Sequence, residues 1–298
     1  MGCEELFGEF SVSFVHTDCL VSRVMEQEPA GTPRPPSDPR TVRVEVSGAV
    51  ATLEISRPAR RNALDADLCT RVTAALREVD ADENARVVVV KGASPAFCAG
   101  ADFGDFAAGP GRGGFVDAFH ELLDTLAHMR LPSIAAVSGP AIGAGCQLLV
   151  QCDLRIASVE SQIGITGARI GLMLDMDNIN RLVCEAGPAA ARRILLTGDL
   201  LSADEAFALG MIHAVAADEV ATFDMAAKWA ENVAMRAPLA VQGHKAAVQS
   251  IVDGWWLPES AAAHSENSER ALRVFGSDDL QEGLSAFSER RPPEFEGR

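Results

Sequence analysis

The sequence lacks the signals of several protein classes. Its seven cysteines are scattered along 298 residues and include no CxxC pair. This spacing argues against a disulfide framework or a zinc site, and it suits the reducing cytoplasm in which we expect the protein to lie. No apolar run reaches the roughly 18–20 residues of a membrane span. The first residues include Glu4 and Glu5, which is unlike the basic start of a secretory signal.

Basic residues are also scarce. The chain has 26 Lys and Arg against 42 Asp and Glu, which gives a formal net charge of −16. Nucleic acids and anionic membrane surfaces are bound through basic patches, so neither is an expected partner. An anionic small molecule is compatible with this charge, because it needs only a few arginines or backbone donors. The hydrophobic content of 48% is enough for a sizeable core.

The composition divides the chain into three parts. Residues 1–40 are predicted to form a flexible N-terminal extension, because residues 30–40 contain four prolines and a glycine. Residues 41–210 are predicted to form an α/β core, and residues 211–298 a helical C-terminal region, since helix patterns dominate beyond residue 175. The expected strands are 42–46, 50–55, 87–91, 134–137 and 153–157. The expected helices are 65–79, 115–129, 146–150, 177–186, 188–196, 202–209, 219–235, 238–252, 258–274 and 278–288.

A glycine-rich segment, Pro132–Asp153, is the most informative part of the chain. Its apolar residues Ile134–Val137 predict a buried strand, and a turn with Gly139, Gly143 and Gly145 leads from this strand into an apolar helix. The start of such a helix leaves backbone N–H groups free, and these donors suit an oxyanion or a thioester carbonyl. Close packing of helix and strand without any ligand is the alternative, and the spacing alone leaves both open.

Three segments together resemble the crotonase (enoyl-CoA hydratase/isomerase) superfamily. They are RPARRNAL at 57–64, AFCAGADF at 96–103 and the glycine-rich segment, and the resemblance covers residues 41–298. It implies an α/β fold with a spiral core of ββα turns and a helical C-terminal trimerisation region. A homotrimer, or a hexamer built as a dimer of trimers, is the implied assembly.

The same resemblance implies where a ligand binds. Ala101 and Ala144 match the two backbone N–H donors of an oxyanion hole that grips the thioester of an acyl-CoA or enoyl-CoA. No metal and no cofactor other than the CoA thioester itself is implied. Asp102 is also expected to support the oxyanion turn. For each of Arg60, Arg61 and Arg290, the alternative to a CoA contact is a solvated charge on the surface. The implied contacts with CoA are Arg60, Arg61, Ala63, Leu64, Ala99, Asp102, Phe103, Phe287 and Arg290.

The sequence departs from the hydratases at both of their catalytic acids. Hydration of an enoyl thioester needs two carboxylates that position a water and move its protons. The matching positions hold Gln147 and Gly167. An amide can hold a water but cannot act as a base near neutral pH. The sequence therefore argues against ordinary hydratase activity.

One acidic residue remains close to this region. Asp175 matches a catalytic aspartate of the dienoyl-CoA isomerases in the superfamily, but the other two acids of that set fall at Gln147 and Gly167. A ligand-facing acid and a capping or ion-paired acid are both open for Asp175. Asp177 is expected to cap the helix that follows.

The acyl chain has candidate neighbours in two places. His120 and His128 lie on the expected helix at 115–129, where a position on the helix surface is favoured over one in the acyl site. Several apolar residues fit an acyl-chain tunnel, although a buried core explains them equally well. These residues are Ile163, Ile165, Ile170, Leu172, Met173 and Leu174.

The expected function is binding of acyl-CoA in fatty-acid or lipid metabolism, with weak or no hydratase activity. Gln147, the pair Leu174–Asp175 and the Arg-Pro-Pro-x-Phe tail resemble an actinobacterial subgroup of the superfamily, which implies binding of long acyl-CoA without turnover. An active enoyl-CoA isomerase or hydratase, a lyase that uses Asp175 as acid or base, is the alternative. A purely structural trimer in a lipid-synthesis complex is a third interpretation.

Overall fold

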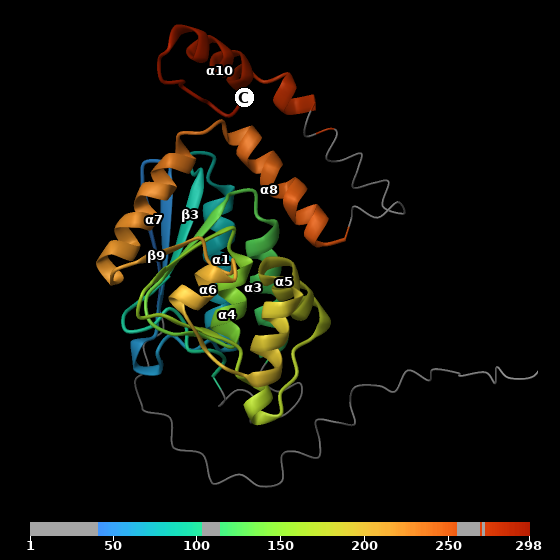
Figure 1. Ribbon diagram of the computed structural model, residues 1–298. Helices are drawn as coiled ribbons and strands as arrows, with labels where there is room; N and C mark the ends of the chain where they lie inside the picture. Colours follow the sequence, from blue (N-terminus) through green and yellow to red (C-terminus); the bar gives the residue numbers. More distant parts are fainter. Residues whose placement is uncertain (1–40, 103–113, 255–268, 270–271) are drawn as a thin grey trace, which may run out of the picture.

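A computed structural model of the chain describes residues 41–102, 114–254, 269 and 272–298 (Figure 1). The expected extension at 1–40, Phe103 and most of the expected helix at 258–274 lie outside these residues. Across the described ranges, no helix is long and apolar enough to cross a membrane.

Six strands form the main sheet. They are β1 (Thr41–Ser47), β2 (Val50–Ser56), β3 (Val87–Gly92), β4 (Ser133–Val137), β6 (Leu154–Ser158) and β9 (Ala214–Ala216). Their order across the sheet is β1-β2-β3-β4-β6-β9. The hairpin of β1 and β2 is antiparallel, and every later pair is parallel. The α/β architecture that the sequence predicts is confirmed.

Each face of the main sheet has its own hydrophobic core, because side chains alternate along a strand. The covering helices are α1 (Ala66–Ala81), α3 (Phe115–His128), α4 (Ala144–Gln151) and α7 (Glu219–Ala234). On β3, Val88 and Val90 pack in one core with α1, α3 and α4. Val87 and Val89 pack in the other core with α7. The continuous valine run of this strand is therefore buried from both sides.

A second, small sheet lies next to the glycine-rich segment. It consists of β5 (Ala141–Ile142), β7 (Gln162–Gly164) and β8 (Leu201–Ser202). β7 is its central strand, parallel to β5 and antiparallel to β8. The expectation of helices alone beyond residue 175 is wrong, since β8 and β9 both follow it. Strands of two or three residues are too short to show an alternating pattern in the sequence.

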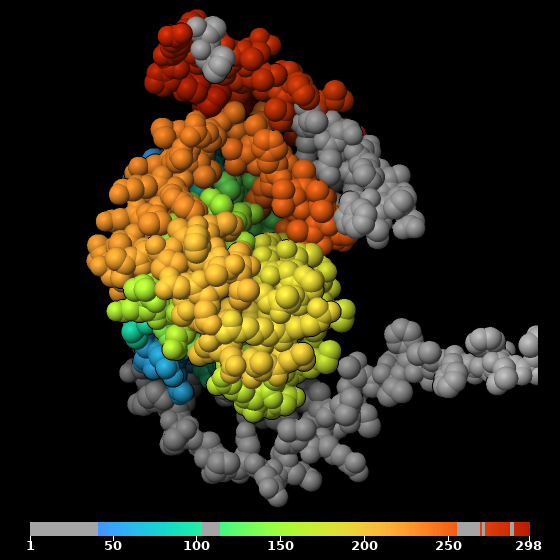
Figure 2. Space-filling view, viewed as in Figure 1, coloured from blue at the N-terminus to red at the C-terminus, as the bar shows by residue number. Residues whose placement is uncertain are grey.

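The second half of the chain is mostly helical. Its longest helix, α5 (Met176–Thr197), is interrupted at Gly187, where φ is 77°, just before Pro188. This break agrees with the two separate helices predicted at 177–186 and 188–196. Figure 2 shows that α5 (yellow) and the segment from α6 to α7 (orange) form much of one surface of the molecule.

Three further helices belong to the second half of the described chain. They are α6 (Ala203–Ala208), which packs against β8 and β9, α8 (Pro238–Val252) and α10 (Asp278–Glu289). Figure 1 shows α10 beyond the ends of α7 and α8. The C-terminal tail is tied back to the body, because Arg86 Nη2 donates to the carbonyl oxygen of Phe295 at 2.5 Å.

Candidate active site

Two backbone turns meet beside the small sheet. The N–H of Leu64 donates to the carbonyl oxygen of Gly100 at 2.8 Å, and the N–H of Asp102 donates to that of Leu64 at 2.7 Å. This parallel bridge pairs Leu64 with Ala101 and leaves the N–H of Ala101 pointing to the other side. On that side, the N–H of Ile142 donates to the carbonyl oxygen of Cys98 at 3.0 Å.

The second expected donor, Ala144, is the first residue of α4. The N–H groups of a first helical turn have no partner within the helix. Among the described residues, neither the N–H of Ala101 nor that of Ala144 has a hydrogen-bond acceptor. A Cβ added to Gly100 would lie 4.0 Å from the nitrogen of Ala144. Gly100, the residue before Ala101, therefore lies close to the first N–H group of α4.

The glycines of the turn have two different roles. Gly143 precedes the helix with φ 56° and ψ −116°, a backbone conformation that needs glycine. A Cβ on Gly145 would lie 2.1 Å from the carbonyl oxygen of Cys98. Close packing at Gly145 is thus present beside N–H groups that have no acceptor among the described residues.

A buried arginine braces the first turn. Arg57 is fully buried, and its Nη2 donates to Asp102 Oδ2 at 2.7 Å. Its Nη1 donates to the carbonyl oxygen of Ala63 at 2.9 Å and lies 3.3 Å from Asp65 Oδ2. Asp102 therefore supports the oxyanion turn, as expected. Sequence reasoning did not single out Arg57 as a site residue, although the residue opens the first resembling segment.

A pocket of about 330 Å³ opens beside the two donors. It brings together all five positions predicted for catalysis, namely Ala101, Ala144, Gln147, Gly167 and Asp175, and one of the nine predicted CoA contacts, Ala99. Five of the six candidate tunnel residues also line it, namely Ile165, Ile170, Leu172, Met173 and Leu174. The sixth, Ile163, does not line it and is fully buried in the core as part of β7.

The pocket also contains residues that sequence reasoning missed. Phe115 and Phe119 of α3 line it, with their rings stacked at a centroid distance of 5.4 Å. Their spacing of four residues places them on one face of the helix, and this spacing was a usable signal. Together with the five tunnel residues they make the pocket wall largely apolar, which suits an acyl chain.

The backbone around Gly167 leaves no space for the side chain of an acid. Gly167 begins the 3-10 helix η3 (Gly167–Ile170), and the N–H of Leu172 donates back to its carbonyl oxygen at 2.9 Å. A Cβ on Gly167 would lie 2.7 Å from the carbonyl oxygen of Leu172. Contacts this short require the backbone to move, so this turn does not accept a side chain at 167.

Asp175 both caps a helix and faces the pocket, so the two interpretations left open by the sequence hold together. As N-cap of α5, its Oδ1 accepts from the N–H of Asn178 at 2.9 Å. Its Oδ2 accepts from Asn178 Nδ2 at 2.8 Å and lies 2.9 Å from His120 Nε2. The expected N-cap, Asp177, lies inside the first turn of α5 instead.

The hydrogen bonds of Asp175 set its charge. Partial burial raises the pKa of this carboxyl, but the bonds from Asn178 and His120 outweigh that effect and hold the pKa below its usual range. Asp175 is therefore ionised near neutral pH. In this state it accepts hydrogen bonds and protons but cannot donate one.

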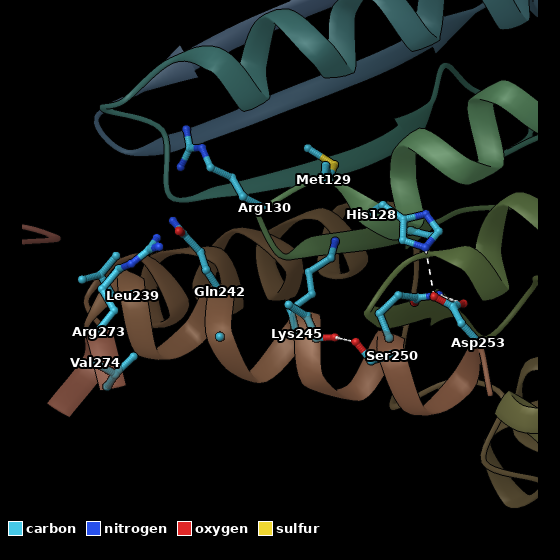
Figure 3. Close-up of a pocket in the computed structure, with 14 residues that line it drawn as sticks. His128, Met129, Arg130, Leu239, Gln242, Lys245, Ser250, Asp253, Arg273 and Val274 are labelled. Carbon is cyan, nitrogen blue, oxygen red and sulfur yellow. Dashed lines mark hydrogen bonds and ion pairs between the residues drawn. The ribbon is translucent and has the colours of Figure 1, made fainter. Parts of the chain in front are cut away.

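The two histidines of α3 differ in position. His120 is exposed on the surface of α3, as the sequence favours, and it also lines the pocket. The sequence could not reveal that His120 lies close to Asp175, because the two residues are 55 positions apart. His128 is absent from the pocket lining and instead lies 3.0 Å from Asp253 Oδ2 (Figure 3).

Buried thiols lie close to the oxyanion turns. Cys98 and Cys146 are fully buried, and burial raises the pKa of each to about 12. A thiol acts as a nucleophile only as the thiolate, so neither residue is suited to attack a thioester. In the part of the chain that the structure describes, no group of His, Cys, Asp or Glu could hold a metal ion.

The expected CoA contacts are only partly brought together. Arg60 and Arg61 are exposed, and within the described ranges neither side chain has an ion-pair partner. Arg61 lies directly beside the site, because its carbonyl oxygen accepts from the N–H of Ala99 at 3.0 Å. Arg290 is exposed at the end of α10 and does not line the pocket. Phe103 and the side chain of Phe287 lie outside the described residues.

Another cavity lies away from this pocket. It has a volume of about 480 Å³ and lies between α8 and the end of α3, and Lys245 and Arg130 are among its lining residues (Figure 3). Lys245 Nζ already bonds to the carbonyl oxygens of Leu126 and Leu131 and pairs with Asp153 at 2.9 Å. This lysine joins α8 to the loop after α3, so its role here is structural.

Comparisons with known proteins agree with this geometry. A probable enoyl-CoA hydratase of Mycobacterium tuberculosis is 39% identical over 251 residues, which is 84% of this chain and 96% of that protein. The (E)-benzylidenesuccinyl-CoA hydratase of Thauera aromatica is 34% identical over 86% of this chain and 99% of its own length. A crystal structure of an enoyl-CoA hydratase/carnithine racemase from Magnetospirillum magneticum superposes with a TM-score of 0.79 at 31% identity, covering 87% of this chain and 97% of that one. The sequence profile of the enoyl-CoA hydratase/isomerase family matches residues 45–298, and the chain therefore belongs to this family, the crotonase superfamily.

Proposed function

We propose that the protein binds an acyl-CoA in fatty-acid or lipid metabolism and has weak or no hydratase activity. The thioester oxygen accepts hydrogen bonds from the N–H groups of Ala101 and Ala144, and the acyl chain lies in the adjoining pocket. The observation that carries this proposal is the pair of free N–H donors at an apolar pocket that has an amide at Gln147 and no side chain at Gly167.

The CoA end of the ligand is assigned to the loop that holds Arg60 and Arg61. Both are exposed cations, and the backbone of Arg61 is hydrogen-bonded to Ala99 beside the donors. A net charge of −16 repels an anionic ligand at long range, so a local pair of arginines is the element that makes binding of phosphates favourable.

An active isomerase or hydratase is the second candidate, and the presence of Asp175 in the pocket favours it. Its carboxylate can accept a proton but, with a pKa held below the usual range, cannot serve as general acid. A purely structural trimer in a lipid-synthesis complex is the third candidate. A homotrimer or a dimer of trimers, in the cytoplasm, is the assembly that we propose in all three cases.

Two measurements on the purified protein separate these candidates. Calorimetric titration with a saturated long-chain acyl-CoA is expected to give binding, and a hydration assay with crotonyl-CoA is expected to stay at background. Hydration that Asp175→Asn abolishes would favour the second candidate. Absence of binding to any CoA ester would contradict both and leave the structural trimer.

A further inference from the structure

His120 lies at the boundary between two cavities. It lines the acyl pocket, and it also lines a second cavity of about 380 Å³ that extends between α3, α5 and the end of α8. Asn178 is the other residue that lines both. The second cavity is polar, since Asp124, Gln151 and Asn180 are among its lining residues. His120 therefore faces an apolar ligand site on one side and a polar cavity on the other.

The hydrogen bonds of the pair determine how the imidazole of His120 is used. Asp175 is ionised, so the hydrogen on Nε2 of His120 points to Oδ2 at 2.9 Å. In the neutral ring, the other nitrogen, Nδ1, is then an unprotonated acceptor. Among the described residues Nδ1 has no hydrogen-bond partner. A carboxylate that holds one ring nitrogen and leaves the other free is the arrangement of a general base.

We propose that His120 is the acid–base group of the acyl pocket and that Asp175 orients it, so that the site exchanges protons on the α-carbon of a bound acyl thioester. This proposal rests on the acyl-CoA binding proposed above. It assigns to the chain a proton transfer that needs neither of the two glutamates of a hydratase.

The step is balanced in atoms and electrons. His120 Nδ1 removes a proton from the α-carbon, and the electron pair of the C–H bond forms the enolate, whose oxygen accepts from the N–H groups of Ala101 and Ala144. The imidazolium that results is stabilised by Asp175. Return of a proton to the same carbon restores the thioester, and the polar cavity gives the imidazole a place to exchange its proton. No oxidant, reductant or second substrate takes part.

Asp175 is the less suitable base of the two. Its carboxylate already accepts two hydrogen bonds from Asn178 and one from His120, and its pKa lies below the usual range. A base that binds its proton weakly removes one from carbon slowly, whereas the best base has a pKa near the working pH. Histidine is the side chain that ordinarily changes charge between about pH 5 and 8. The charged and titratable groups that face His120 are Asp175, Asp177 and Arg181 on α5, Asp124 and His128 on α3, and Asp253 after α8.

The test is deuterium exchange with a saturated acyl-CoA. Palmitoyl-CoA is incubated with the full chain in D₂O, and deuterium at the α-carbon is measured by mass spectrometry. We expect protein-dependent exchange, and His120→Gln should lower its rate by about 100-fold or more, the contribution of a general base. Calorimetry with the same ligand should give an unchanged dissociation constant for His120→Gln, because Gln can still donate to Asp175.

The chain contains a matched control on the same helix. His128 is also 3.0 Å from an aspartate, Asp253, and its side chain has the same exposed fraction as that of His120, 44%, but it does not line the acyl pocket. His128→Gln should therefore leave exchange unchanged. His120→Ala should lose exchange and recover part of it when free imidazole is added, which a purely structural role would not produce.

Asp175→Asn tests the orienting role. Asparagine is as good an N-cap as aspartate, so α5 keeps its first turn while the charge beside His120 is removed. Exchange should fall by about 10-fold, as expected for loss of a charge-assisted hydrogen bond. Full exchange in His120→Gln would overturn the assignment to His120. Binding without any exchange would overturn this inference alone, and absence of binding would overturn the proposed function itself.

Discussion

Gly167 occupies a position at which the backbone leaves no room for a side chain. The carbonyl oxygen of Leu172 lies 2.7 Å from where a Cβ would be, and it belongs to backbone, which cannot rotate away as a flexible side chain can. The missing second acid is therefore not a simple substitution in a hydratase site. A glutamate at 167 would need a different course of the chain between Gly167 and Leu172.

We predict that Gly167→Ala lowers the free energy of unfolding by about 1–3 kcal/mol, the usual cost of forcing an extra carbon into a packed position. Denaturant unfolding followed by circular dichroism measures this change. The control is Gly243→Ala on α8, where the added Cβ would meet only Val274 Cγ2, at 3.9 Å. Alanine is favoured over glycine in a helix, so this control should be neutral or stabilising by up to about 1 kcal/mol. Equal stability of the two variants would show that the turn at Gly167 is free to open.

The same contact limits attempts to restore hydration. The variant Gln147→Glu with Gly167→Glu adds both acids, but only the first fits the backbone as it stands. Sequence reasoning alone treats the two substitutions as equivalent. The contact of a Cβ at 167 with Leu172 makes the two substitutions unequal. This contact arises from the turn between Gly167 and Leu172, and no sequence motif specifies how that turn runs.

At the scale of elements, α4 begins at Ala144, whose N–H is one of the two donors that we propose for the thioester oxygen. Proline is well tolerated at the first position of a helix, because its missing N–H has no partner within the helix there and its φ already fits. At Ala144 this means that the donor can be removed while the helix is kept. The substitution thus separates the hydrogen bond to the ligand from the stability of the fold.

We predict that Ala144→Pro weakens binding of a saturated acyl-CoA by about 5-fold, since one hydrogen bond contributes about 1 kcal/mol. Any exchange at the α-carbon should fall further, by about 100-fold or more, because the enolate depends on the donor more strongly than the ground state does. Calorimetry and deuterium exchange measure the two effects. Glu219→Pro, at the first position of α7, is the control and should change neither. An equal loss in binding and exchange would mean that the donor of Ala144 does not favour the enolate.

The long elements of the fold were predictable and the short ones were not. α1, α3 and α7 have apolar residues at helical spacing over 14 to 16 residues, and β3 has four consecutive valines, so each shows its own pattern. β5 and β8 have two residues each, and they exist because Ala141 and Leu201 find partners on β7. Their pairing is set by tertiary contacts, which local patterns do not contain.

In the site, too, features marked by a local sequence motif were predictable, and features set by tertiary contacts were not. The two donors and the two missing acids could be located because contiguous motifs mark them at Ala101, Ala144, Gln147 and Gly167. The pair of His120 and Asp175 could not be predicted, because it depends on how α3 approaches the start of α5. Asp177 was the wrong N-cap for a similar reason. Aspartates stand at both 175 and 177, and only the observed backbone selects Asp175 as the N-cap.

At the scale of the whole molecule, the C-terminal region of a single chain exposes large apolar side chains. Val248 and Ile251 on α8, Leu272 and Phe275 before α10, and Leu284 on α10 are each more than half exposed. Apolar residues gathered in one region of a surface are typical of contacts between subunits. This part of the chain is the one that the sequence assigns to trimerisation.

We predict that the protein elutes with three or six times the mass of one chain in size-exclusion chromatography with light scattering. Ile251→Glu, which places a charge among these residues, should lower that mass. Leu196→Glu is the control, because Leu196 is 76% exposed but lies on α5, away from the C-terminal helices. A monomer at micromolar concentration, or an assembly that Ile251→Glu leaves intact, would contradict the proposed role of this region.

Arg57 has a consequence for how the two ends of a ligand are recognised. Its side chain holds the loop of Arg60 and Arg61 through Ala63 and the oxyanion turn through Asp102, with no exposed atoms of its own. Arg57 thus holds the loop of Arg60 and Arg61, which we assign to the nucleotide, rigidly against the turn at Ala101, which we assign to the thioester. For the acyl-CoA that we propose as ligand, the distance between the segment for the CoA phosphates and the segment for the thioester is therefore fixed before binding. This distance should match the length of the pantetheine arm.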